Sequence, residues 1–220
     1  MTPRITFEHA LEELKAALEE MGGQVESTYD RLFLAIGAGD KNTIRNILRE
    51  DRTINDMEKS IESRCLSLIT RQQPIARDLR VISATLKIVT DLERAGDHVA
   101  DIAELALRFE NTDIFKYSTH LAAMADAAKE QIHAAVTCFL ERDMEAAAEV
   151  IKGDDIIDDL FNKVKMDIIR YLREGQFPAD ECIDIMMIAK YLEKIGDHAN
   201  NIAEWERFQE TGNMQDTRLL

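Results

Sequence analysis

The chain has 220 residues, a formal net charge of −15 at pH 7, and only three prolines and nine glycines. This charge disfavours a general nucleic-acid binder and direct electrostatic adhesion to anionic lipid, because both need a basic face. Three cysteines without a CxxC pair give no sign of a disulfide framework or a thiolate zinc site, and no apolar stretch is long enough to span a membrane. We therefore expect a cytoplasmic protein without direct membrane insertion.

Long segments of helical apolar periodicity, rich in Ala, Leu and Glu, predict an all-α fold. Short turns such as "GAGD" at residues 37–40 and "ERD" at 141–143, and the interior prolines Pro74 and Pro178, mark where helices end. The predicted helices cover residues 4–37, 41–72, 75–110, 114–141, 144–174 and 179–209. Residues 211–220 are expected to form a frayed tail.

The chain also contains an internal repeat. A shift of 103 residues pairs Leu18 with Leu121 and the turn residue Asp40 with Asp143, and the third helix of each copy matches at a shift of 100. Each copy should be an up-down-up bundle of three helices, because short connections make sequential helices antiparallel neighbours. The predicted units are residues 1–111 and 112–210, packed together.

The strongest match is "LERAGDH" at residues 92–98 and "LEKIGDH" at 192–198. A glycine inside a helix costs about 1 kcal/mol relative to alanine, so its repetition needs a reason. At 100° per residue the acidic side chains of each motif form one stripe along the border of the buried face, and the glycine lies on the apolar band. We expect the glycines to allow close approach of a neighbouring helix, and His98 and His198 to be surface or interface residues rather than ligands.

Folding each preceding helix back about its turn places further oxygen donors level with the stripe: Asn55 with Glu93, Asp51 with Asp97, Asp158 with Glu193 and Asp154 with Asp197. No basic residue is expected within the stripe, and clustered carboxylates need a counter-charge. Oxygen ligands suit hard cations such as Mg²⁺, Mn²⁺, Ca²⁺ or iron. A solvated acidic face is the alternative, and recurrence in both copies favours metal. The candidate ligands are Glu93, Asp97, Asp101, Asp51 and Asn55 in the first copy, and Glu193, Asp197, Asn201, Asp154 and Asp158 in the second.

The motifs "LERAGDHVADIAE" and "LEKIGDHANNIAE", the "FEHALEELKAALEEMG" opening and the "RQQPIARDLR" turn resemble the PhoU family of bacterial phosphate-uptake regulators over nearly the whole chain. The resemblance implies multinuclear iron or zinc at the acidic motifs, with Glu93, Asp97, Asp101, Glu193 and Asp197 as ligands. Asn201 departs from Asp101, which suggests a weaker second site. The resemblance further implies a non-enzymatic regulator that acts with the phosphate ABC transporter ATPase and a sensor histidine kinase, and a homodimer.

Two other functions stay open. A carboxylate-bridged di-metal enzyme would need Glu-x-x-His, but Gly96 and Gly196 occupy the histidine position. A metal-free structural adaptor needs no ligand at all. Arg71, Arg77 and Arg80, with Arg64, surround the Pro74 turn and form a candidate partner surface. The alternative, a solubilising helix end, is the simpler explanation of these residues.

Overall fold

The computed structural model describes residues 3–214 and 217–218, and almost all of them are helical. The helices are α1 (Pro3–Ala38), α2 (Lys41–Glu50), α3 (Arg52–Gln72), α4 (Ala76–Ala106), α5 (Thr119–Glu141), α6 (Met144–Glu174) and α7 (Ala179–Thr211). A 3₁₀ turn, η1 (Ile114–Tyr117), precedes α5. The all-α prediction is confirmed.

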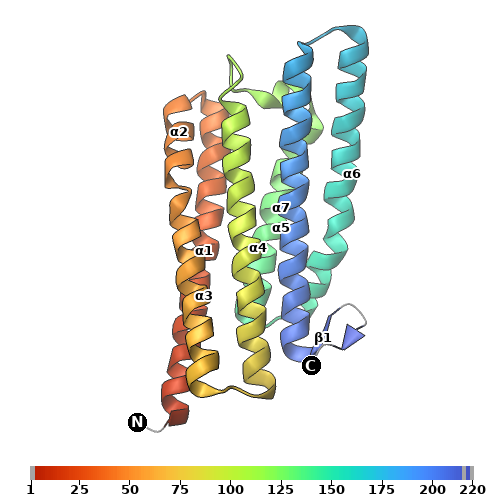
Figure 1. Cartoon of the computed structure of the whole chain (residues 1–220). Helices are drawn as coiled ribbons and strands as arrows, with labels where there is room; N and C mark the ends of the chain where they lie inside the picture. Colours follow the sequence, from red (N-terminus) through yellow and green to blue (C-terminus); the bar gives the residue numbers. More distant parts are fainter. Residues whose placement is uncertain (1–2, 215–216, 219–220) are drawn as a thin grey trace.

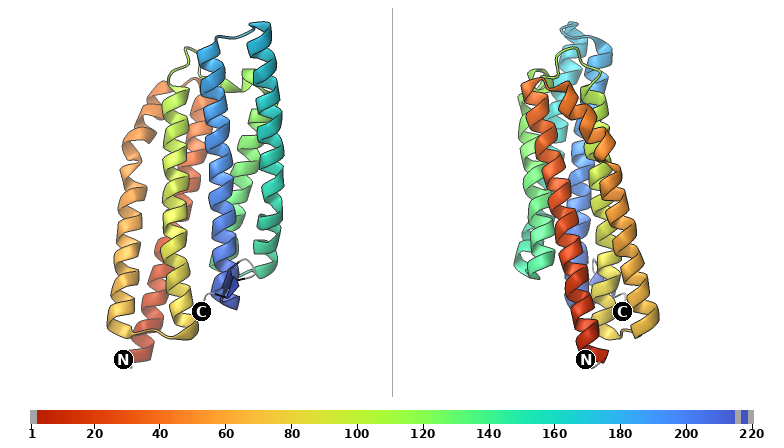
Figure 2. Two further views of the ribbon diagram at one scale, coloured as in Figure 1. Left: turned by 45° about the vertical axis from the view of Figure 1, so that its right-hand side comes forward. Right: turned by 90° about the vertical axis from the view of Figure 1, so that its left-hand side faces the viewer.

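The helices form two elongated bundles that lie side by side (Figure 1). The first contains α1 to α4, and the second contains α5 to α7. The bundles meet along α4 and α7, and α1 also contacts α5. The left view of Figure 2 shows α1 and α5 behind the row made by α3, α4, α7 and α6, and the right view shows α1 and α5 on the same side of that row. The third helix of each repeat is therefore central to the molecule.

The core of each bundle follows the predicted repeat. Leu18, Met21 and Leu32 are buried in α1. Their partners at a shift of 103, Leu121, Met124 and Ala135, are buried in α5. This spacing of three to four residues per turn buries one stripe of each helix.

The turns repeat as well as the core. The carboxylate of Asp40 accepts hydrogen bonds from the backbone N–H groups of Asn42 and Thr43, both at 3.1 Å. Asp143 does the same for Glu145 (2.9 Å) and Ala146 (3.0 Å). Each aspartate caps the helix that follows it, because the first turn leaves backbone donors without helical acceptors.

The predicted helix over residues 41–72 is divided at Asp51 into α2 and α3. There the N–H of Ile54 donates to the carbonyl of Asp51 at 3.1 Å, a spacing of three residues that tightens the helix locally. In the second copy α6 runs unbroken through the equivalent Asp154.

The remaining differences lie at helix ends. The third predicted helix ends at Ala106 rather than 110. The next begins at Thr119 rather than 114, because the Ser118 hydroxyl accepts a hydrogen bond from the N–H of His120. In the predicted frayed tail, Gly212 takes φ 75° and the strands β1 (Asn213–Met214) and β2 (Thr217–Arg218) pair antiparallel. Residues 215–216 and 219–220 of that tail lie outside the described residues.

Candidate metal centre

The motif glycines bring two helices of each bundle close together. A Cβ at Gly96 would lie 2.9 Å from the Cδ1 of Ile54 on α3, and one at Gly196 would lie 2.7 Å from the Cδ1 of Ile157 on α6. Both isoleucines are buried. The predicted close approach is confirmed, and it places the acidic side chains of the two helices near each other.

The first acidic cluster consists of Asp51, Glu93 and Asp97. Burial raises the pKa of the Asp51 carboxyl, and the negative charges of Asp97 and Asp101 raise it further. The pKa of Glu93 is also raised, first by burial and then by the charges of Asp97 and Glu58, against the lowering effect of Arg94. The cluster thus holds carboxylates that oppose one another's ionisation.

The second acidic cluster consists of Asp154, Glu193 and Asp197. The pKa of Asp154 is raised by burial and then by the charges of Asp197 and Asp158. The side chains of Glu93 and Glu193 are each 15% exposed, so the two copies bury this position equally. In both copies, therefore, burial and neighbouring carboxylates raise the pKa of the aspartate on the preceding helix, Asp51 in the first and Asp154 in the second.

The charge of Asp97 raises the pKa of Asp51, and the charge of Asp197 raises the pKa of Asp154, which agrees with the predicted pairing of these residues. Asn55 instead donates to Asp51 at 3.5 Å, and Glu58, about one turn further along α3, acts on Glu93. Sequence reasoning missed Glu58 because the register was fixed only by the position of the Pro74 turn.

Basic side chains lie against both clusters, which contradicts the expectation of a stripe without them. Arg94 is 3.6 Å from both Glu93 and Asp97. In the second cluster Lys194 pairs with Asp197 and lies 3.7 Å from Glu193, and Lys190 also pairs with Glu193. Arg94 and Lys194 flank the stripe on the helical wheel, at about 100° from the motif glutamate, and their long side chains reach back to it. Lys190 lies at about 60°, within the stripe itself, at a position where the first copy has Thr90.

The donor set of both clusters is carboxylate oxygen, which fits a hard cation. However, no three His, Cys, Asp or Glu side chains among the described residues form a group that would hold one metal ion. The helices of each bundle bring carboxylate oxygens close to one another. The carboxylates of α4 and α7 form ion pairs with arginine or lysine side chains of the same helix.

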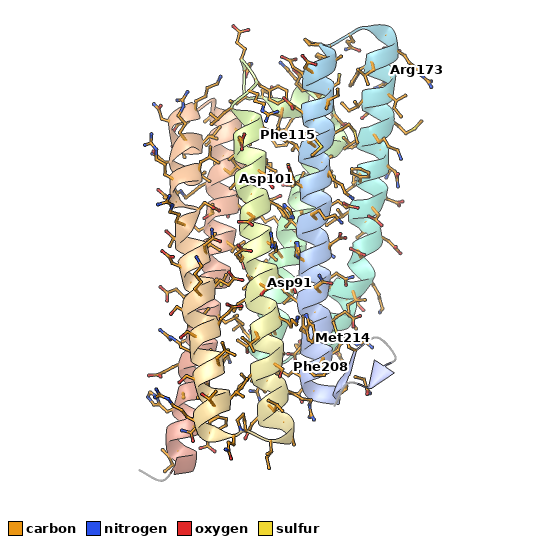
Figure 3. All side chains as sticks on the ribbon, viewed as in Figure 1. Asp91, Asp101, Phe115, Arg173, Phe208 and Met214 are labelled. Carbon is orange, nitrogen blue, oxygen red and sulfur yellow. The ribbon has the colours of Figure 1, made fainter. Side chains whose placement is uncertain are left out.

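The ends of the two stripes face the junction between the bundles. Figure 3 labels Asp91 and Asp101 on α4, beside α7. Asp91 accepts a hydrogen bond from Asn201 at 3.1 Å and contacts the Nδ1 of His198 at 2.8 Å. The amide of Asn201, a predicted ligand of the second copy, is therefore engaged with the first copy.

His98 and His198 occupy this junction, as expected of interface residues. Their rings stack with centroids 5.6 Å apart, and the ring of His98 also stacks on Tyr191 at 5.4 Å. The Nδ1 of His98 lies 3.3 Å from Asp101. Asp91 and Tyr191 occupy equivalent positions at the shift of 100. This difference between the two copies is the feature of the sequence that could have indicated the contacts of these residues with His198 and His98.

Two of the three predicted partner-binding arginines contact α7. Arg77 forms an ion pair with Glu210 at 2.8 Å, and the Nε of Arg80 donates to the backbone carbonyl of Gln209 at 3.1 Å. Arg71 is exposed at the end of α3. Arg77 and Arg80 thus contribute to the junction between the two copies.

No helix in the described part of the chain combines the length and the apolar character that crossing a bilayer requires. The PhoU domain family matches residues 18–106 and 121–205, one match for each bundle. The phosphate-specific transport system accessory protein PhoU homolog of Clostridium acetobutylicum is 36% identical over 217 residues, which cover 98% of this chain and 99% of that protein. PhoU homolog 1 of Thermotoga maritima is 31% identical over 98% of this chain and 94% of its own length.

Crystal structures of relatives have the same fold. The phosphate transport system regulatory protein PhoU from Streptococcus pneumoniae superimposes with a TM-score of 0.88 at 26% identity, covering 96% of this chain and 99% of that one. PhoU from Pseudomonas aeruginosa gives 0.85 at 27% identity, covering 94% and 100%. With two matched domains and relatives of full length, the chain belongs to the PhoU family, whose members are non-enzymatic regulatory proteins.

Proposed function

We propose that this chain regulates phosphate transport by binding partner proteins, and that a cation at each acidic cluster completes its structure. The names of its relatives support association with the phosphate-specific transport system. Family resemblance further suggests the ABC transporter ATPase and a sensor histidine kinase as partners, and a homodimer as the assembly. The cytoplasmic face of a transporter is where such a protein would act.

The observation that carries the metal proposal is the duplicated excess of negative charge. Asp51 and Glu93 in one copy and Asp154 in the other have raised pKa values because burial and neighbouring carboxylates oppose ionisation. A cation would remove this repulsion. Asp101 and Asn55 lie beside the first cluster. Asp158 lies beside Asp154 of the second cluster, whereas Asn201 is hydrogen-bonded to Asp91 of the first copy. Iron or zinc follows from the resemblance, and Mg²⁺ or Mn²⁺ also suits oxygen donors.

Arg94, Lys190 and Lys194 would have to turn outward when a metal binds. Two lysines contact the second cluster and one arginine the first, so the second cluster is already more neutralised. We therefore expect the first cluster to bind metal more tightly.

Elemental analysis of protein purified without chelator tests this directly. Glu93→Gln with Asp97→Asn should lower the metal content more than Glu193→Gln with Asp197→Asn does. Glu19→Gln with Glu110→Gln, on exposed positions, serves as a control with the same change of charge. Equal metal content in all four proteins would remove the ligand assignment.

A metal-free adaptor is the second candidate, and the ion pairs of Arg94 and Lys194 favour it because they already supply counter-charge. Pull-down of the transporter ATPase by chelator-treated protein separates the two functions. Undiminished binding after complete metal removal would favour the adaptor, and loss restored by added metal would favour the regulator with bound cations.

The partner surface needs a test that spares the fold. Arg71→Glu changes an exposed side chain, and it should weaken the pull-down if the Pro74 turn meets an acidic surface. The exchange Arg77→Glu with Glu210→Arg replaces Arg77 but keeps an ion pair at the junction, so it tests the role of Arg77 in binding without removing that contact. Unchanged binding in both proteins would place the partner surface elsewhere.

A further inference from the structure

The outer face of the second bundle contains a groove of about 340 Å³ between α5 and α6. Ala127 and Ala134 line it from α5, and Ala146 and Ile156 line it from α6. Ile156 is 58% exposed, so the apolar lining of the groove extends to the protein surface at this edge. Gln131 and Ile157 form the buried side of the groove.

In the first bundle an ion pair spans the equivalent place. At the shift of 103, Ala134 corresponds to Arg31 and Gly153 corresponds to Glu50. Arg31 and Glu50 form an ion pair of 2.7 Å that links α1 to α2. In the second bundle nothing lies within 4 Å of the Cβ position of Gly153. The two copies therefore differ in a specific way: the ion pair that links the two helices in the first bundle is replaced in the second by alanine and glycine, the two smallest residues.

The charges around the groove indicate what would fill it. Glu130 and Glu149 lie on its two rims, and its described lining contains no lysine or arginine. Lys152 pairs with Glu149 at 2.7 Å, but both side chains are at least 70% exposed. A lysine or arginine of a partner can therefore replace Lys152 in this ion pair at little cost in free energy. An apolar centre with acidic rims matches an amphipathic helix whose apolar residues are flanked by basic ones.

We propose that the groove between α5 and α6 is a docking site for a partner helix that inserts apolar side chains and places lysine or arginine against Glu130 and Glu149. The two antiparallel helices supply a concave track, and residues four apart on a third helix would fall along it. The site uses no ligand of the acidic clusters, and it does not depend on metal binding.

Binding of a defined peptide tests the proposal. The probe is a fluorescein-labelled helical peptide with two leucines four residues apart on an alanine and lysine background, followed by fluorescence anisotropy in the presence of chelator. Ala134→Arg with Gly153→Glu rebuilds the covering pair of the first bundle and should weaken binding at least tenfold. Ala179→Arg with Gly23→Glu introduces the same residue types at exposed positions outside the groove and should leave binding unchanged.

Both double variants leave the net charge unchanged, so non-specific attraction of a basic peptide to an acidic protein affects them equally. Replacing the leucines by alanine should also reduce binding tenfold, and Glu130→Lys with Glu149→Lys should make a glutamate peptide the better ligand. Equal affinity of the two double variants, with unchanged circular dichroism spectra, would overturn the proposal. A wild-type dimer that Ala134→Arg with Gly153→Glu converts to a monomer would also overturn it, because a second copy would then fill the groove.

Discussion

The Cδ1 of Ile157 packs against Gly196, in the space that a side chain at this position would need. A Cβ on this glycine would be 2.7 Å from that atom. Gly196→Ala should therefore lower the free energy of unfolding by about 1–2 kcal/mol, since overpacking of a core outweighs the gain in helix propensity. Adding Ile157→Val removes Cδ1 and leaves the Oε1 of Gln131 as nearest neighbour at 3.4 Å, so the double variant should recover most of the loss. Urea denaturation followed by circular dichroism measures both.

Gly153→Ala provides the matched control, because this helical glycine has nothing within 4 Å of its Cβ position. The substitution should raise the free energy of unfolding by about 0.5–1 kcal/mol. Opposite signs at Gly153 and Gly196 would show that contact, rather than helix propensity, explains the repeated motif. Stabilisation at both positions would contradict the close-packing role.

Glu206 is fully buried near the end of α7, and burial is the main reason that its pKa is raised to about 7. Gln209 donates to one carboxylate oxygen, while the charge of Glu210 opposes ionisation. A folded pKa above the unfolded value means that the native state binds more protons between about pH 4.5 and 7, so this group's stabilising contribution falls as pH rises through that interval.

Glu206→Gln removes this titration while keeping the shape and a polar terminus. Relative to the wild type, the variant should gain about 2 kcal/mol in free energy of unfolding between pH 5 and pH 8. Denaturation curves of both proteins at the two pH values give the difference, and other titrating groups cancel in it. A difference that is the same at pH 5 and pH 8 would show that Glu206 does not titrate in this interval.

The basic residues beside the clusters show where reasoning from single residues fails. A helical wheel assigns Arg94 and Lys194 to neighbouring faces, but each lies one residue after the motif glutamate and three before the aspartate. Ion pairs at that spacing form readily because long side chains bend along the helix. Position on the helical wheel predicted that the carboxylates lie on one face. The length of the arginine and lysine side chains determines which ion pairs those carboxylates form.

At the scale of elements, periodicity and turn residues predicted every long helix and the duplication. Asp40 and Asp143 could be recognised as turn residues because an aspartate at a helix start has a defined capping role. The break at Asp51 could not, since Asp154 occupies the equivalent place in the unbroken α6. The difference arises from hydrogen bonding between neighbouring turns, which composition does not encode.

Two arginines of α4 hold the end of α7 by different contacts. Arg80→Ala should lower the free energy of unfolding by about 1–2 kcal/mol, because a partly buried charged donor to the Gln209 carbonyl is lost. Arg77→Ala should change it by less than about 1 kcal/mol, since the Arg77 side chain is 57% exposed. Thermal and urea unfolding of the two variants distinguish them, and a larger effect at Arg77 would reverse this assignment.

In the whole molecule the two repeats meet at contacts that their sequences do not share. The stacked pair His98 and His198 obeys the internal symmetry, but Asp91 on one side corresponds to Tyr191 on the other. One copy thus provides an acceptor for His198 and Asn201, and the other provides a ring for His98. A duplicated bundle that packs against itself can diverge at this seam while its core stays fixed.

This asymmetry predicts different effects of equivalent substitutions. Asp91→Ala should lower the free energy of unfolding by about 2 kcal/mol, because both His198 and Asn201 lose their acceptor at a largely buried position. Tyr191→Phe keeps the ring that stacks on His98 and should change stability by less than about 0.5 kcal/mol. Hydrogen exchange should locate the effect of Asp91→Ala in α4 and α7, with α1 and α6 less affected. Uniformly faster exchange in all helices would instead mean that the two bundles unfold as one unit, and that the junction is no weaker than the cores it joins.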